Sequence, residues 1–438
     1  MFYRLCFLLL GALAGIPSAW SEVVRVEIDS RQPVLGGQSF GAHGSYEVVR
    51  GRLYLSFDPA DPKNAKIVDL QRAPRNSSGR VEAWTTFVAL QPKSLDRARG
   101  VALVEVSNRG TKFSPLYFNR AASANLDPDD PNAFGDAHLL RLGLTVIWIG
   151  WQFDVPDRPG VLRLHVPNAR HVDDSPIMGL VRSDWTVDAP VASLPLAHRD
   201  HRAYPVVDPQ DVANILTVRD GREAPRQEVS RDRWAFGRIK NGHRIPDPAH
   251  IVLDGGFKAG KIYELVYRAK DPAVVGLGLA TIRDVISYAK YDNTSIFPAK
   301  LGLAVGVSQT GRFLRHFLYQ GFNTDEQGRP AYDGLMIIAA GAGRGSFNHR
   351  FAQPSRDAHR YSAFFYPTDL FPFTSATQLD PLQWQSDGLL AHLADPNHAP
   401  KIFYINTGYE YWGRVASLTH TTPDGTADIA PLPNERVY

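Results

Sequence analysis

The sequence contains almost no cysteine: Cys6 is the only one among its 438 residues. Because Cys6 lies in the apolar stretch at the N-terminus, the rest of the chain has no thiol for a disulfide, a thiolate metal site or a cysteine nucleophile. Runs of like charge are also missing, and the formal net charge is only +3. We therefore expect no nucleic-acid-binding face built from clustered basic residues.

Long hydrophobic runs are scarce as well. The run from Leu5 to Ile16 is too short for a comfortable membrane span, and no later segment reaches the roughly 20 residues that a span requires. Arg4 precedes this run, and small residues follow it before Glu22, which is the pattern of a signal peptide. We predict a signal peptide at residues 1–21, an extracytoplasmic (periplasmic or secreted) protein, and no stable membrane insertion once the signal is removed.

Apolar residues make up 44% of the chain, which is enough for a large buried core. Residues 22–98 show short alternating runs separated by turn residues. This pattern predicts an antiparallel β-rich layer beside the main sheet. The expected strands are Val23 to Ile28, Tyr46 to Phe57, Ile67 to Leu70 and Val81 to Leu90.

From residue 99 to residue 438, strand-like runs alternate with helical patterns. This order predicts an α/β domain with a mostly parallel sheet and helices on both faces. Two stretches, at about 152–260 and 343–400, lack the alternation and are expected to be a long insertion and a cap. In such sheets the chemistry lies at the carboxyl ends of the strands. Polar or small residues follow four expected strands, at Asn108, Gly150, Ser308 and Asn406.

The most informative of these ends is Ser308. An apolar run from Leu301 stops at this serine, Gly306 and Thr310 lie on either side of it, and an amphipathic helix pattern begins at once. A strand, a tight turn and a helix in this order form a nucleophile elbow, which exposes a serine hydroxyl. Small neighbours allow the strand and helix backbones to approach closely. We predict that Ser308 is a nucleophile; the alternative is a chance turn between core elements.

A serine nucleophile requires two donors for the oxyanion. In α/β-hydrolases one donor is the backbone N–H of the residue after the nucleophile, which is Gln309 here, and the other comes from the loop after the third strand. Asn108-Arg109-Gly110 occupies that place in the chain, and Arg109 is also suited to orienting an anionic or carbohydrate substrate. The alternative for these three residues is an ordinary turn at a strand end.

The catalytic acid should follow the nucleophile in the chain and lie just past a late strand. Glu410, soon after the run from Lys401 to Asn406, fits this position best. Asp369 is the rival, although its surroundings resemble a cap loop. The alternative for Glu410 is a surface carboxylate near Arg414.

The catalytic histidine should come last, after the final strand. Only His420 follows Glu410, and it precedes the strand that begins at Glu435. Either His420 is the base, or the chain as given ends before the true base, and we favour the second interpretation. The histidines before Glu410 are expected to be surface or cap residues: His316, His349, His359, His392 and His398.

Other candidate sites are weaker. Asp127-Pro-Asp-Asp130 with Asn132 could supply calcium ligands, but the spacing matches no known loop and the prolines suit a solvated turn. Trp148 and Trp151 flank a strand end and are expected in the core, with a sugar-stacking role for Trp151 as the alternative. No glycine-rich phosphate loop and no His-Glu-x-x-His motif occurs, so we predict no cofactor and no metal.

Several short motifs taken together resemble a group of exported bacterial proteins with an α/β-hydrolase domain, largely uncharacterised and similar to serine esterases. The motifs are Gly44-Ser-Tyr-Glu47, Asp58-Pro59, Ala73-Pro74-Arg75-Asn76, Val106-Ser-Asn108-Arg109-Gly110, Gly150-Trp151-Gln152, Gly306-Val-Ser308-Gln-Thr-Gly311-Arg312, Tyr366-Pro-Thr-Asp369-Leu-Phe-Pro-Phe373 and Glu410-Tyr-Trp-Gly-Arg414. The resemblance implies an α/β-hydrolase fold with Ser308 as nucleophile and Glu410 near the acid position. It also implies a histidine in a turn after the strand that starts at Arg436.

These observations predict a carboxylic-ester hydrolase that forms an acyl-enzyme on Ser308. The expected substrate is a small-molecule or carbohydrate ester, and the oligomeric state stays open. An inactive hydrolase-like binding module, with carbohydrate as one candidate ligand, is the alternative that the missing histidine allows. Acyl transfer in place of hydrolysis is a third interpretation.

Overall fold

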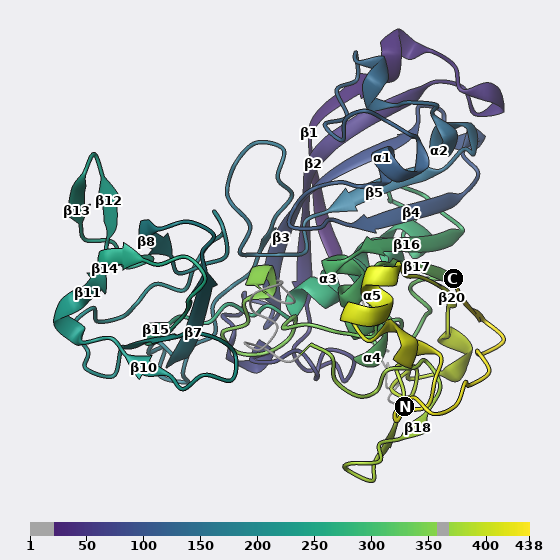
Figure 1. The fold of residues 1–438 in the computed structure, drawn as a ribbon. Coiled ribbons are helices and arrows are strands. Elements are labelled where there is room, and N and C mark those ends of the chain that lie inside the picture. The colour runs from purple at the N-terminus through teal and green to yellow at the C-terminus, as the bar shows by residue number, and fades with distance from the viewer. Residues whose placement is uncertain (1–21, 357–367) are drawn as a thin grey trace, which may run out of the picture.

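The computed structural model describes residues 22–356 and 368–438, so the predicted signal peptide at residues 1–21 lies outside the described residues. One large mixed sheet of ten strands runs through the molecule (Figure 1). Nine of its strands, in spatial order, are β1 (Val23–Pro33), β2 (Tyr46–Phe57), β3 (Val81–Pro92), β5 (Thr145–Ile149), β4 (Val101–Val106), β16 (Leu301–Val307), β17 (Gly334–Ile338), β20 (Lys401–Ile405) and β21 (Glu435–Val437). The tenth, β6 (Leu164–His165), pairs with β3 beside this row.

The sheet has an antiparallel part and a parallel part. β1, β2 and β3 pair antiparallel, and β3 also pairs antiparallel with β5. From β5 to β21 all neighbouring strands are parallel. The pairing of β3 with β5 joins the two parts. The N-terminal strands therefore extend the main sheet, where the sequence had predicted a layer beside it.

The strand predicted from Ile67 to Leu70 is wrong. This segment consists of turns and ends in a 3₁₀ helix, Leu70–Arg72. The Ile67 N–H donates to the carbonyl oxygen of Asn64 at 2.9 Å, and the Asn64 side chain donates to the carbonyl oxygen of Asp58 at 2.9 Å. These local hydrogen bonds replace pairing with a neighbouring strand. Ile67 and Leu70 are apolar because both lie in the core, and this is why the segment resembled a strand.

Helices cover the two faces of the sheet unequally. α3 (Leu277–Tyr291) and α4 (Gln309–Tyr319) pack on one face. The other face carries α1 (Ser114–Phe118) and α2 (His138–Arg141), which have only five and four residues. α5 (Gly408–Gly413) follows β20 at the carboxyl edge. The predicted cover of helices on both faces is thus uneven, because the proline- and aspartate-rich segment between α1 and α2 favours turns.

A β-rich unit, the part coloured teal in Figure 1, is inserted between β6 and α3. Its strands are β7 (Met178–Thr186), β8 (Val191–Pro195), β9 (Ile215–Arg219), β10 (Gln227–Glu228), β11 (Trp234–Phe236), β12 (Arg238–Lys240), β13 (His243–Ile245), β14 (His250–Phe257) and β15 (Ile262–Lys270). They form small antiparallel sheets around a hydrophobic core of their own, which includes Trp234, Leu265 and Tyr267. In the described part of residues 343–400, the strands are β18 (Gln378–Leu379) and β19 (Ser386–Asp387).

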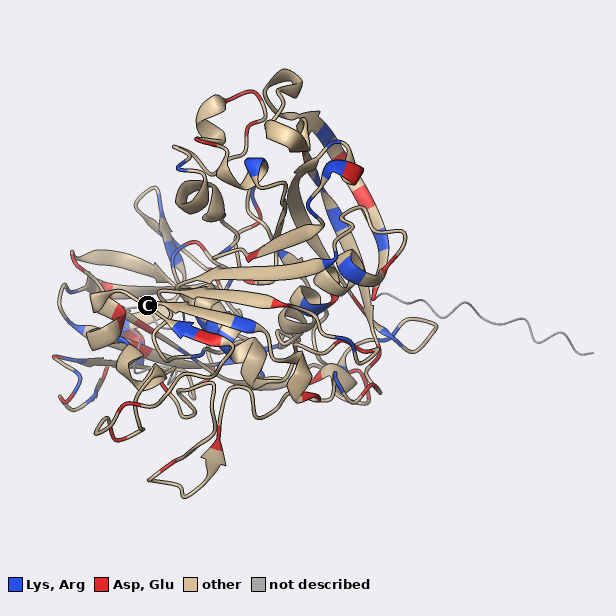
Figure 2. Ribbon diagram, turned by 90° about the vertical axis from the view of Figure 1, so that its right-hand side faces the viewer, with Lys and Arg blue, Asp and Glu red and all other residues tan. Residues whose placement is uncertain are grey.

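Charged side chains are distributed over the whole fold. Lysine and arginine lie interspersed with aspartate and glutamate along the described chain (Figure 2). Exposed pairs such as Arg52 and Asp29, with 3.0 Å between nitrogen and oxygen, are typical of this arrangement. Within residues 22–356 and 368–438, no helix combines the length and the apolar character that crossing a membrane would require.

Candidate active site

Ser308 lies in a sharp turn between the end of β16 and the start of α4. Its backbone has φ 57° and ψ −109°, a conformation that residues with a side chain rarely adopt. Two glycines make the turn feasible. A Cβ on Gly306 would lie 2.3 Å from the carbonyl oxygen of Thr310, and one on Gly311 would lie 2.9 Å from that of Ile338. Strand and helix are therefore too close at these points for any larger residue.

Hydrogen bonds hold the turn in this conformation. The Ser308 N–H donates to the carbonyl oxygen of Ile338 on β17, at 2.8 Å. The Thr310 hydroxyl accepts the N–H of Val307 at 2.9 Å. No described residue hydrogen-bonds the hydroxyl of Ser308, and the residue is half-buried. The hydroxyl is thus available to a ligand that approaches the carboxyl edge of the sheet.

Asn108 stands beside this turn at the end of β4. β4 and β16 are parallel, with Val101 opposite Leu301 and Glu105 opposite Val305. If the same register continues for three residues beyond Glu105 and Val305, Asn108 lies opposite Ser308. The Asn108 side chain donates from Nδ2 to the carbonyl oxygen of Val307, at 2.8 Å, and thereby ties the end of one strand to the other.

Asn108, Arg109 and Gly110 form a tight turn. Arg109 has φ 48° and Gly110 has φ 79°, and the Thr111 N–H donates to the carbonyl oxygen of Asn108 at 3.0 Å. Two successive positive φ angles are typical of a type I′ turn. A Cβ on Gly110 would lie 2.4 Å from Cγ1 of Val161, so glycine is required there for space as well as for conformation.

Glu105, buried on β4, anchors the segment that follows this turn. Its carboxylate accepts the Ser114 N–H at 2.7 Å and the Trp148 indole N–H at 2.6 Å. Burial raises the pKa of Glu105, although these donors act in the opposite direction. Trp148 and Trp151 are both fully buried, so Trp151 is a core residue and cannot stack on a sugar ring.

Arg109 connects the turn to two other loops. Its guanidinium donates to the carbonyl oxygen of Ser355 at 3.1 Å and to Oδ1 of Asn108 at 3.1 Å. Ser355 in turn accepts Nε2 of Gln152 at 2.5 Å, and its N–H donates to Asp154 at 3.2 Å. The loop after β5 and the cap segment around Ser355 are therefore fastened to the Asn108 turn. Sequence reasoning did not detect Asp154 or Ser355.

Gln309 is the first residue of α4, where backbone N–H groups have no partner within the helix. Its side chain is buried and donates from Nε2 to the carbonyl oxygen of Pro354, at 2.8 Å. The Gln309 N–H directly follows Ser308 in the chain and lies at the start of α4. The positive end of the helix dipole lies at the same point.

Glu410 lies in the first turn of α5, near the end of β20. Its Oε2 accepts the Thr407 N–H at 3.0 Å and also the Thr407 hydroxyl, while the Thr407 hydroxyl accepts the Tyr409 N–H at 3.2 Å. This is a capping box, so the carboxylate stabilises its own helix. Glu410 is buried at the same edge of the sheet as Ser308, but no hydrogen bond joins the two in the described chain.

The described contacts of His420 are with residues other than Ser308. Its ring stacks on Tyr411, with 5.9 Å between centroids, and its Nδ1 lies 3.6 Å from Asp428. It lines a cavity of about 470 Å³ at the ends of β20 and β21. Among the described residues, His420 hydrogen-bonds neither Ser308 nor Glu410. The assignment of Ser308, Glu410 and His420 to one triad therefore stays a prediction.

Asp369 lies nearer to the elbow helix than its cap-like sequence suggested. A Cβ on Gly343, just after β17, would lie 2.7 Å from Oδ1 of Asp369 and 3.4 Å from Cδ of Arg312 on α4. Two arginines that sequence reasoning missed hold this loop. Arg315 donates to the carbonyl oxygen of Phe373 at 2.6 Å, and Arg344 donates to that of Pro372 at 3.0 Å.

The remaining candidates lie elsewhere. His316 was expected at the surface or in a cap, but it is buried on α4 beside Phe347. His392 and His398 pair with Asp387 and Asp395. His359 lies outside the described residues. Asp127 and Asp130 each accept a backbone N–H from two residues further along, which is the hydrogen bonding of a turn.

Comparison with known protein families matches part of the chain. Residues 262–427 match a family model described as an alpha/beta hydrolase domain. The matched segment contains Ser308, Asp369, Glu410 and His420, and the match supports a hydrolase in general. No curated protein and no solved structure gives a significant match to the chain.

Proposed function

We propose that this protein is a serine hydrolase that cleaves carboxylic esters through an acyl-enzyme on Ser308. The observation that carries the proposal is the backbone of Ser308, with φ 57° and ψ −109° between β16 and α4. Such a conformation costs on the order of 1–3 kcal/mol and persists mainly where a site requires it. The carboxyl edge of a parallel sheet is also where substrates bind in folds of this class.

In the proposed reaction the Ser308 oxygen attacks the ester carbonyl carbon, the alcohol leaves, and water later releases the acid from the acyl-enzyme. The Gln309 N–H and the helix start beside it stabilise the oxyanion. The second side of the oxyanion site comes from the turn of Asn108, Arg109 and Gly110. The substrate class is a small-molecule or carbohydrate ester.

We assign the acid to Glu410, with Asp369 as the alternative. The position of Glu410 after β20 and its burial at the sheet edge support this assignment. Its use as a helix cap counts against it. Asp369 is supported by its closeness to Gly343 and Arg312, immediately beside the elbow helix.

A second candidate function is a hydrolase-like module that binds carbohydrate without cleaving it. One observation favours this alternative. Within the described chain no histidine hydrogen-bonds the Ser308 hydroxyl, and without a base a serine is a poor nucleophile.

A fluorophosphonate probe distinguishes the two functions, because it labels only activated serines. We expect the purified protein to be labelled and Ser308→Ala to remain unlabelled. Ser417→Ala is the matched control, since Ser417 is also half-buried and its hydroxyl takes part in no hydrogen bond with described residues. Equal labelling of the protein and Ser308→Ala, or no labelling of either, would overturn the hydrolase proposal and leave the binding module.

A further inference from the structure

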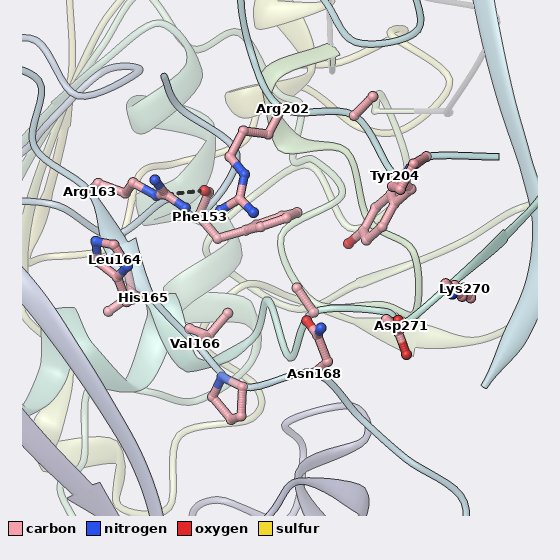
Figure 3. A pocket seen from close by; sticks show the side chains of 14 residues that line it. Phe153, Arg163, Leu164, His165, Val166, Asn168, Arg202, Tyr204, Lys270 and Asp271 are labelled. Atoms are coloured by element: carbon pink, nitrogen blue, oxygen red, sulfur yellow. Dashed lines mark hydrogen bonds between the residues drawn. The ribbon is translucent and has the colours of Figure 1, made fainter. Parts of the chain in front are cut away.

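A cleft of about 510 Å³ lies between the large sheet and the β-rich insertion (Figure 3). Its walls come from residues 163–168 around β6, residues 202–205 of the insertion, and residues 270–273 at the end of β15, with Phe153 between them. The volume falls within the roughly 300–1,000 Å³ that is usual for small-molecule sites. Ser308 is not among the residues that line it.

Two of the charged side chains in the cleft are neutralised by neighbours. Asp271 lies 3.5 Å from Nη1 of Arg170, and Arg163 lies 3.4 Å from Asp157. Arg163 also donates to the carbonyl oxygen of Phe153, at 3.2 Å. Because Asp271 and Arg163 are paired, they add polar groups to the walls of the cleft but contribute little net charge.

Two cations remain without a counterion. In the part of the chain that the structure describes, Arg202 and Lys270 take part in no ion pair and no side-chain hydrogen bond, and both are exposed. Arg202 is held at its backbone, where its N–H donates to the carbonyl oxygen of Asp154 at 2.7 Å. The cleft therefore carries a positive charge that an anionic ligand would neutralise.

Aromatic rings also line the cleft. Phe153 packs against Tyr204, with 5.7 Å between centroids, and the Tyr204 hydroxyl donates to the carbonyl oxygen of Ala352 at 3.2 Å. His165 stacks flat on Trp84, at 3.5 Å and 7°. In Figure 3 the side chains of Arg202, Phe153 and Tyr204 are directed toward the same space. A flat or ring-shaped group can pack against Phe153 there.

We propose that this cleft binds a ring-bearing carboxylate, with the carboxylate attracted by the positive charge of Arg202 and Lys270 and the ring against Phe153. A guanidinium matches a carboxylate with two parallel hydrogen bonds, and a lysine adds charge without that geometry. Either a sugar acid or an aromatic acid has this chemistry. The inference does not rest on ester hydrolysis, because binding in the cleft uses neither Ser308 nor a general base.

Calorimetric titration of the full chain tests the inference with two acids and their neutral counterparts. The sugar arm compares galacturonate with galactose, and the aromatic arm compares ferulate with coniferyl alcohol. We expect one acid to bind at least about tenfold more tightly than its neutral partner, and the arm that responds identifies the ligand type. Absence of saturable binding of both acids at millimolar concentration would overturn the inference.

Substitutions in the cleft test whether the acid binds there. Arg202→Gln and Lys270→Gln change exposed side chains, so both should fold and both should weaken binding of the acid about tenfold. Lys258→Gln, an exposed lysine of the insertion outside the cleft, is the matched control and should bind normally. Ser308→Ala should also bind normally, which separates this result from the outcome of the hydrolase test. Unchanged binding in both Arg202→Gln and Lys270→Gln would contradict the inference.

Discussion

Asn108 and Ser308 occupy matching positions at the carboxyl ends of two neighbouring parallel strands, and the Asn108 amide donates to the residue before the serine. The chain leaves β4 toward β5 on one side and returns to β16 on the other side. Such a reversal of direction creates a crevice at the strand ends, and ligands of α/β sheets bind in that crevice. The pair therefore marks the position of the proposed active site.

Asn108→Ala should impair both stability and ester turnover. The change removes a buried hydrogen bond and leaves the Thr310 hydroxyl as the remaining side-chain donor to the Val307 carbonyl oxygen, which costs about 1 kcal/mol of unfolding free energy. It also loosens the turn that forms part of the proposed oxyanion site, so we expect kcat to fall more than KM rises. Urea denaturation and hydrolysis of p-nitrophenyl acetate measure the two effects. Asn293→Ala, in an exposed turn, is the control and should resemble the unchanged protein.

Gly306→Ala should prevent the elbow from forming. The added Cβ would lie 2.3 Å from a backbone oxygen that cannot move without shifting α4, so we expect a loss of about 3 kcal/mol in stability. Gly408→Ala is the matched control, because a Cβ there meets no atom within 4 Å. Thermal unfolding of the two variants compares them directly. A Gly306→Ala protein as stable as Gly408→Ala would show that strand and helix are not this close.

Glu410 has two proposed roles that substitution can separate. Glu410→Ala removes the capping box and should cost about 1 kcal/mol. Glu410→Gln keeps an oxygen that can accept the Thr407 N–H, so its stability should remain close to normal. If the negative charge supports catalysis, ester turnover of Glu410→Gln falls at least about tenfold, which is the result we expect. Undiminished turnover would limit Glu410 to capping and favour Asp369 as the acid.

His316 should make the fold sensitive to acid. Burial, followed by the charges of Arg344 and His349, lowers the pKa of His316 to about 3 from its ordinary 6.5. Between these values the unfolded chain takes up a proton that the folded chain does not, so stability is complete above pH 6.5 and declines as pH falls toward 3. The decline amounts to about 1.4 kcal/mol per pH unit for one histidine.

His316→Leu tests this dependence. Neither ring nitrogen of His316 has a hydrogen-bond partner among the described residues, so the substitution leaves no polar group unsatisfied. We expect the introduced leucine side chain to pack against Phe347 and the slope of stability against pH to become shallower. Urea denaturation from pH 4 to pH 7.5 measures the slope. An unchanged slope would mean that other groups, such as His349, cause the acid sensitivity.

Some features could be predicted because they depend on a few adjacent residues. Gly306, Ser308 and Gly311 meet within one turn, and their sizes alone indicate a close approach of strand and helix. The strands from Tyr46 to Phe57 and from Val81 onward were also evident from alternation. The same reasoning misread Ile67 to Leu70, because burial of isolated apolar residues in turns imitates a short strand.

The sequence by itself determined the elbow at Ser308 and most of the strands, since local backbone conformation depends on side chains only a few positions apart. Only the tertiary structure decided which distant groups lie near that serine. It engaged Glu410 in the cap of its own helix, placed His420 near Asp428, brought Asp369 beside Arg312, and placed Arg202 of the insertion in the same cleft as Phe153. The physical reason is that the order of the strands depends on how the chain buries its apolar surface as a whole. A pattern of a few adjacent residues therefore does not predict which strand ends become neighbours.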